Sequence, residues 1–210
     1  MSKELFEAVE THALERLIAA LNDGASANAV KAEWPQWPLL QAAINELEEG
    51  GSLDAVILLL RRGARVDGRV SDRDATPLLM ALFRQQWEVA RMLLAAGADP
   101  NLTGDEGDSP LRACVERGEY AMAALLLRCG ATRTIDEAGG SRLMTALGLA
   151  ASQLDIPLLQ LLLQAGADPE VLDLDRRTAR ERLPSRQADN SKAWDAAAAL
   201  LYNPPSSTPG

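Results

Sequence analysis

The sequence is poor in the residue types on which most catalytic and metal sites depend. Its 210 residues include one histidine, two cysteines and 4% aromatic residues. Neither Cys114 nor Cys129 has a CxxC partner or a nearby histidine, so both are expected to be buried core thiols. The single histidine, His12, has no second ligand near it and is expected to be solvated or to cap a helix. These absences argue against an enzyme, and we expect no cofactor and no metal.

Long apolar runs and an excess of positive charge are also missing. No stretch approaches the roughly 18 residues that a membrane-spanning helix needs, and the first residues are acidic where a secretory signal is basic and then apolar. With 30 Asp and Glu against 21 Lys and Arg, the net charge is −9. This sign disfavours nucleic acid and anionic membranes as partners and favours a protein with a basic or mixed-charge patch. We therefore expect a cytoplasmic protein that is a monomer when free.

What the sequence does contain is one unit repeated along the chain, most clearly in residues 74–101. Thr76 is placed to cap a helix, Pro77 to occupy its first position, and Gly97 to end a second helix in the left-handed conformation. Between them, apolar residues recur at helical spacing with one polar break. The unit therefore predicts two short antiparallel helices followed by an extended loop.

Two independent markers repeat in register along the chain. Gly-Ala pairs begin at residues 24, 63, 97, 130 and 166, in steps of 39, 34, 33 and 36 residues. The residues that start first helices follow in steps of 39, 33, 36 and 33, and they are Trp37, Thr76, Ser109, Thr145 and Thr178. The Thr-Pro-Leu start, the Leu-Leu pair of the second helix and the Gly-Ala-Asp after it resemble the ankyrin repeat, whose period is about 33 residues.

The resemblance implies an all-α fold, an ankyrin-repeat solenoid of helix-turn-helix units with hairpin finger loops. It covers a single domain, residues 1–202. We expect an N-terminal capping repeat at 1–24, internal repeats at 25–63, 64–97, 98–130 and 131–166, and a C-terminal capping repeat at 167–202. The outer face of the first repeat is charged, as a terminal repeat exposed to water requires. Residues 203–210, rich in proline and serine, are expected to be a disordered tail.

One repeat is longer than the others. The distance from Pro38 to Gly63 is 25 residues, whereas the matching distance from Pro77 to Gly97 is 20. The extra residues fall around 45–51, which predicts a longer first helix or a wider loop between the helices. Leu79 and Arg112 stand where the family has a histidine, so the hydrogen bonds that this histidine makes between fingers are in question, although the stack itself is not.

In the ankyrin family, partners usually bind the concave side formed by the fingers and the first helices. The family's variable positions, carried over from each helix start, combine acidic residues with scattered arginines and two aromatic anchors. They are Glu33, Trp34, Asn45, Asp72, Arg73, Phe83, Arg84, Asp105, Glu106, Asp108, Glu116, Arg117, Arg142 and Gln153.

The resemblance to small, free-standing, bacterial-looking ankyrin proteins suggests a non-catalytic module for protein–protein interaction. Some proteins of that kind are inhibitors or immunity proteins, antitoxins that occlude a toxin or an enzyme. The alternative is a structural or assembly scaffold, or an adaptor, without inhibitory activity.

Overall fold

The computed structural model describes residues 2–33, 35–69 and 75–204. In these ranges the regular structure consists of helices, and two isolated β-bridges occur outside them. No helix in the same ranges combines the length and the apolar character that crossing a membrane requires. The chain falls into two compact units, Met1–Asp99 and Pro100–Gly210.

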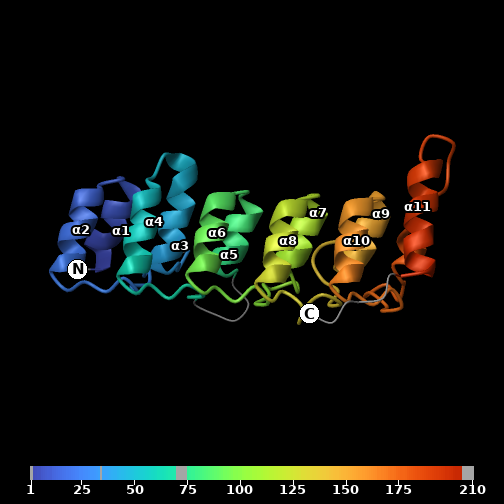
Figure 1. Ribbon diagram of the computed structural model, residues 1–210. Helices are drawn as coiled ribbons and strands as arrows, with labels where there is room; N and C mark the ends of the chain where they lie inside the picture. The colour runs from blue at the N-terminus through green and yellow to red at the C-terminus, as the bar shows by residue number, and fades with distance from the viewer. Residues whose placement is uncertain (1, 34, 70–74, 205–210) are drawn as a thin grey trace. The chain divides into compact units, whose positions relative to one another are not determined.

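The first unit is built from pairs of antiparallel helices that stack side by side (Figure 1). In each pair a first helix packs against the second, and first helices also pack on first helices of the neighbouring pair. The extended loops lie together at one end of the helices (Figure 1), and we call them fingers. The helices are α1 Ser2–Glu10, α2 Leu14–Asn22, α3 Leu39–Glu46, η1 Leu47–Glu49, α4 Leu53–Arg61, α5 Pro77–Phe83 and α6 Trp87–Ala95.

The second unit has the same construction and ends in an altered pair. Here α7 packs on α8 and on α9, α9 packs on α10, and α11 closes the stack against α10. A single 3-10 turn, η2, replaces the first helix of the last pair. The helices are α7 Pro110–Glu116, α8 Tyr120–Arg128, α9 Ala146–Gln153, α10 Ile156–Gln164, η2 Arg180–Arg182 and α11 Ser191–Tyr202.

The helix starts that the sequence predicts are confirmed at three repeats. The hydroxyl of Thr76 accepts a hydrogen bond from the backbone N–H of Leu79 at 3.1 Å, and Ser109 and Thr145 make the same bond at 3.2 and 3.0 Å. Each satisfies one of the N–H groups that the first turn of a helix leaves unpaired. Gly97, with φ at 93°, follows the end of α6 as expected.

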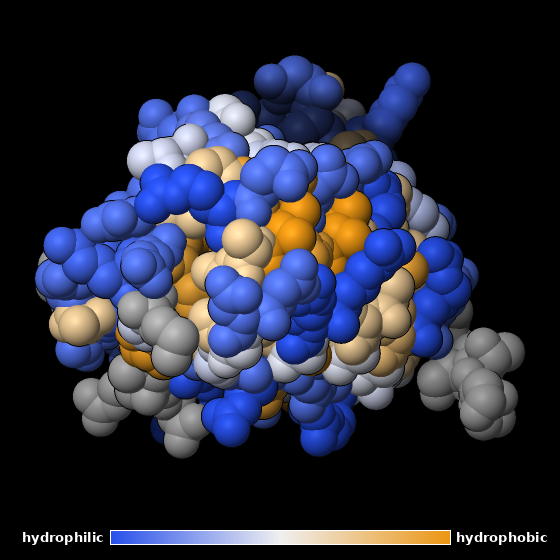
Figure 2. All heavy atoms as spheres, turned by 90° about the vertical axis from the view of Figure 1, so that its left-hand side faces the viewer, coloured by the Kyte–Doolittle hydropathy of each residue, from blue (hydrophilic) through white to orange (hydrophobic). Residues whose placement is uncertain are grey.

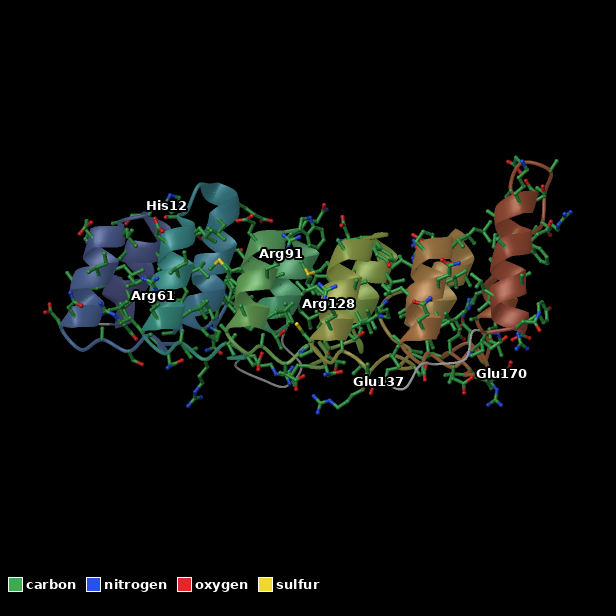
Figure 3. All side chains as sticks on the ribbon, in the orientation of Figure 1. His12, Arg61, Arg91, Arg128, Glu137 and Glu170 are labelled. Atoms are coloured by element: carbon green, nitrogen blue, oxygen red, sulfur yellow. The ribbon has the colours of Figure 1, made fainter. Side chains whose placement is uncertain are left out.

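The longer repeat has both a longer first helix and a wider loop between its helices. Helix α3 continues into η1, and Gly50 then reverses the chain with φ at 94°. Ser52 accepts from the N–H of Asp54 at 3.1 Å and so caps α4. The inserted residues therefore extend the first helix and widen the loop at the end of the helices away from the fingers, near His12 (Figure 3).

Polar side chains tie consecutive fingers together in the first unit. The amide of Asn28 donates to the carbonyl of Gly63 at 3.0 Å and accepts from the N–H of Arg65 at 2.7 Å. In the next finger the carboxylate of Asp67 accepts from the N–H of Asp99, with both distances at 3.2 Å. Burial raises the pKa of Asp67; the hydrogen bond from Asp99 acts to lower it, and the charge of Asp99 raises it further.

The same hydrogen bonds between consecutive fingers, which we call finger clamps, recur in the second unit. Asn101 donates to the carbonyl of Gly130 at 2.9 Å and accepts from the N–H of Arg133 at 3.0 Å. Asp136 accepts from the N–H of Asp168 at 3.0 Å. Neighbouring fingers are thus joined by side-chain amides and carboxylates, although the family's histidine is absent.

The N-terminal end presents mostly polar groups to solvent. In Figure 2 hydrophilic side chains surround a smaller apolar area at the centre of this face. Glu4, Glu15 and Arg16 are exposed there, as expected for a terminal repeat.

The expectation that both cysteines are buried is wrong for one of them. Cys114 lies inside α7 and is buried, whereas Cys129 follows α8 at its C-cap and is exposed. The C-cap residues of α2, α4 and α6, Asp23, Arg62 and Ala96, are exposed as well. His12 is exposed, as the first of its two expected roles requires, and does not cap a helix. It lies in the turn between α1 and α2 with φ at 55°, and its Nε2 is 3.5 Å from Oε2 of Glu46.

Candidate partner-binding surface

The fourteen candidate residues separate into three groups. Three of them, Trp34, Asp72 and Arg73, lie outside the described residues. Four belong to the first unit, namely Glu33, Asn45, Phe83 and Arg84. Seven belong to the second unit, namely Asp105, Glu106, Asp108, Glu116, Arg117, Arg142 and Gln153.

In the first unit Arg84 connects its own repeat to the inserted segment of the repeat before it. Its Nη2 donates to Oδ1 of Asn45 at 2.7 Å, and its Nη1 forms an ion pair with Glu48 in η1. Phe83 is half-buried at the end of α5, while Glu33 is exposed on the first finger. The structure thus brings Asn45 and Arg84 into direct contact and adds Glu48, a residue that the sequence pattern did not single out.

In the second unit the candidate residues surround a buried arginine. Arg112, on α7, has 1% of its surface exposed. Its guanidinium forms an ion pair with Asp108, and its Nη1 lies 3.9 Å from Oε2 of Glu116. Arg112 and Glu116 are four residues apart on α7, a spacing that places side chains on one face of a helix, and Asp108 lies just before the N-cap residue Ser109.

Further contacts extend this cluster to the next finger and the next first helix. Nε of Arg142 is 3.2 Å from Oε1 of Glu116, and the side-chain amide of Gln153 donates to the carbonyl of Glu116 at 2.9 Å. The N–H of Gly140 donates to the carbonyl of Glu106 at 2.7 Å. We call this set the Arg112 network; it comprises Glu106, Asp108, Arg112, Glu116, Arg142 and Gln153.

Burial and neighbouring charges shift the pKa of Arg112 in opposite directions. Removal from water lowers the pKa of its guanidinium, and the carboxylates of Glu116 and Glu106 act to raise it. The side chains of Asp108 and Glu116 keep 25% and 26% exposure, so part of each still faces solvent. The network therefore presents carboxylates at the surface on a frame held by a buried cation.

Two of the seven residues lie outside this network. Asp105 is exposed on the finger that precedes α7. Arg117, just after α7, donates from Nη1 to the carbonyl of Ala113 at 3.2 Å.

Sequence reasoning missed Arg112 and Glu48 as parts of the site. Arg112 stands where the family has a histidine, and its spacing of four from Glu116 on the same expected helix is a usable signal for an ion pair. Glu48 carried no such signal, because its contact with Arg84 joins residues 36 apart through the insertion. The contact depends on how the inserted turn folds.

Comparison with known proteins agrees with this architecture. Residues 73–105 match the sequence model of the ankyrin repeat. The chain is 38% identical over 103 residues to Ankyrin repeat and SOCS box protein 16 of Homo sapiens, a match that covers 49% of this chain and 22% of that protein. The chain thus spans about a fifth of the length of this curated relative. Together with the stacked helix pairs and finger clamps, these matches identify the chain as an ankyrin-repeat protein.

Solved structures share the fold over nearly the whole chain. An ankyrin repeat domain from Acinetobacter baumannii AYE matches with a TM-score of 0.74 and 22% identity, covering 94% of this chain and 95% of that one. A chain from the complex of the Bd0816 predatory endopeptidase of Bdellovibrio bacteriovorus with immunity protein Bd3460 matches with a TM-score of 0.70 and 24% identity, covering 93% and 97%. Ankyrin repeats in general mediate protein–protein interaction and are non-catalytic.

Proposed function

We propose that this chain is a non-catalytic binding module that holds a partner protein through its fingers and first helices. The observation that carries the proposal is the acidic surface of the second unit, where Asp105 and Glu106 are exposed beside the carboxylates of the Arg112 network. A surface on which charges are held in place can bind with little loss of side-chain entropy. It suits a partner with a basic or mixed-charge patch.

Arg84 and Phe83 of the first unit add a different chemistry to the proposed surface. Phe83 offers a half-exposed aromatic ring, and Arg84 a guanidinium already oriented by Asn45 and Glu48. Aromatic and arginine side chains are the types most often found at binding hot spots. We include Trp34, Asp72 and Arg73 in the proposal on the strength of their place in the repeat.

Within this class, we propose an inhibitory or immunity role in which the bound chain occludes a toxin or an enzyme. The fold shared with a chain from an endopeptidase–immunity protein complex supports this reading. A scaffold or adaptor without inhibitory activity is the second candidate, supported by the general use of ankyrin repeats in assembly. The two differ in what happens to the partner's activity.

The test begins with capture of partners by the purified chain and by an Asp105→Lys, Glu106→Lys variant. A Glu88→Lys, Asp189→Lys variant is the matched control, because it changes exposed carboxylates elsewhere by the same charge. We expect one protein to be retained by the wild type and by the control and lost by the first variant. Equal retention by all three would place recognition elsewhere.

The captured protein then decides between inhibition and scaffolding. If it is an enzyme or a toxin, its activity is measured with and without a stoichiometric amount of the chain. Loss of activity that returns with the Asp105→Lys, Glu106→Lys variant supports the inhibitory role. Unchanged activity in the complex would favour the scaffold.

A further inference from the structure

The finger of the last repeat buries a charge and exposes its apolar neighbours. Asp173 is 5% exposed, whereas Leu172 and Leu174 on either side are 49% and 61% exposed. Adjacent side chains of an extended segment point to opposite sides, so an inward Asp173 turns both leucines outward. Folding driven by apolar burial alone would give the reverse arrangement.

Asp173 is held inward by a set of short polar contacts. Its Oδ2 accepts from Nε of Arg182 at 2.6 Å, and its Oδ1 accepts from the N–H groups of Asp175 and Arg177 at 2.9 and 3.0 Å. Burial acts to raise the pKa of Asp173, but the hydrogen bonds from Arg182 and the backbone outweigh it and hold this pKa below its ordinary value. The carboxylate therefore stays ionised, and the orientation of the two leucines is fixed.

A third leucine from the preceding finger joins them. The N–H of Leu174 donates to the carbonyl of Leu143 at 3.1 Å, and Leu143 is 42% exposed. Leu143 has φ at 59°, in the left-handed region that a branched apolar residue seldom adopts. Strained residues persist where the surrounding structure holds them, often at binding sites. We call the three side chains the leucine patch.

The rim of the leucine patch is cationic. Leu174 is followed by Asp175, which is paired with Arg182, and then by Arg176 and Arg177, which are both exposed. In the described part of the chain neither guanidinium has an ion-pair partner, whereas the nearby Arg180 and Arg182 are paired with Glu170 and with Asp173 and Asp175. These two adjacent guanidinium groups therefore give this edge of the leucine patch a positive charge that no carboxylate of the described residues neutralises through an ion pair.

We propose that the leucine patch, with Arg176 and Arg177, is a second docking surface, for a partner segment that presents apolar side chains next to carboxylates. The leucines supply apolar area that is already ordered, and the two guanidinium groups favour a partner segment that carries carboxylates. This surface uses other residues than the acidic surface proposed above and has the opposite sign. An experiment that excludes one of the two docking surfaces therefore leaves the other proposal unaffected.

The test uses three capped peptides of equal length as probes. One alternates leucine and phenylalanine with aspartate and glutamate, the second replaces the acidic residues by lysine, and the third replaces the apolar residues by alanine. Each is titrated into the isotope-labelled full chain while backbone amide signals are recorded. We expect the first peptide to shift signals of residues 141–144 and 171–178 with a Kd below about 1 mM, and the other two to bind at least about tenfold more weakly.

Variants assign the binding to the patch. Leu172→Ser, Leu174→Ser should weaken binding of the first peptide by about tenfold or more, because hot-spot losses are of this size. Val30→Ser is the matched control, since Val30 is 46% exposed on a finger of the other unit, and it should bind as the wild type does. Both variants change exposed side chains, and unchanged circular dichroism will confirm that they fold.

Four results would overturn the proposal. They are no shift with the first peptide, equal binding by the lysine peptide, unchanged binding by the double serine variant, and self-association in sedimentation that this variant abolishes. The last result would assign the leucine patch to a second copy of the chain.

Discussion

Replacing Gly140 by alanine tests how tightly the fingers of the second unit close over Arg112. Gly140 has φ at 63°, and a Cβ built on it would lie 1.9 Å from Nη2 and 2.4 Å from Cζ of Arg112. The end of an exposed arginine would simply move aside. Here the guanidinium is buried and paired with Asp108, so moving it breaks the Arg112 network.

The magnitude follows from two separate costs. Alanine in the left-handed region costs about 1–2 kcal/mol. Displacing well-packed buried atoms adds about 1–3 kcal/mol, so Gly140→Ala should cost about 2–5 kcal/mol in all. Gly130→Ala is the matched control, because Gly130 has φ at 92° and a Cβ added there would meet no atom within 4 Å. It should cost the left-handed strain alone, about 1–2 kcal/mol.

Denaturant titration followed by circular dichroism measures both variants, alone and combined with Arg112→Ala. With the guanidinium removed, Gly140→Ala should cost no more than Gly130→Ala does, which gives a coupling free energy of about 1–3 kcal/mol between residues 112 and 140. Equal costs for the two glycine variants in the wild-type background, or no coupling, would refute the close packing of this finger on Arg112.

Three further predictions follow from the burial of other groups. Burial raises the pKa of Cys114 to about 12, so a maleimide should label Cys129 alone in the native chain and both thiols only after unfolding. Burial also raises the pKa of Asp67, so its ionisation costs native stability as pH rises; Asp67→Asn should match the wild type near about pH 4 and exceed it near about pH 7 in the free energy of unfolding. Asn101→Ala should lower that free energy by about 1–2 kcal/mol, because the carbonyl of Gly130 and the N–H of Arg133 lose their partner.

The helices could be read from the sequence because their signals are local. A hydroxyl cap, a proline in the first turn and a glycine after the last turn act within a few residues, and Thr76 and Gly97 occupy the positions expected of them. The repeat period then implied stacking, since a short helix pair has no other way to bury its apolar face. The division into a single domain and capping repeats remains a prediction.

The pairing of charges could not be read in the same way. Nothing in the sequence distinguishes Glu116 and Arg142 from other charged residues, yet they form an ion pair with each other, and Glu116 also lies 3.9 Å from the buried Arg112. Cys114 lies inside α7 and is buried, whereas Cys129 lies at the C-cap of α8 and is exposed, a difference that the expectation of two core thiols did not anticipate. Such differences depend on which neighbour covers a side chain.

Local sequence by itself determined the helix pairs, the repeat period and the fold, because capping and periodicity act over a few residues and recur along the chain. Tertiary structure alone decided that Arg112 is a buried centre of charge, that Arg84 is held by the inserted turn, and that Asp173 faces inward while its leucine neighbours face water. These features depend on contacts between separate repeats or on the folded course of a finger. The balance of burial and charge at each contact is set only when the chain has folded.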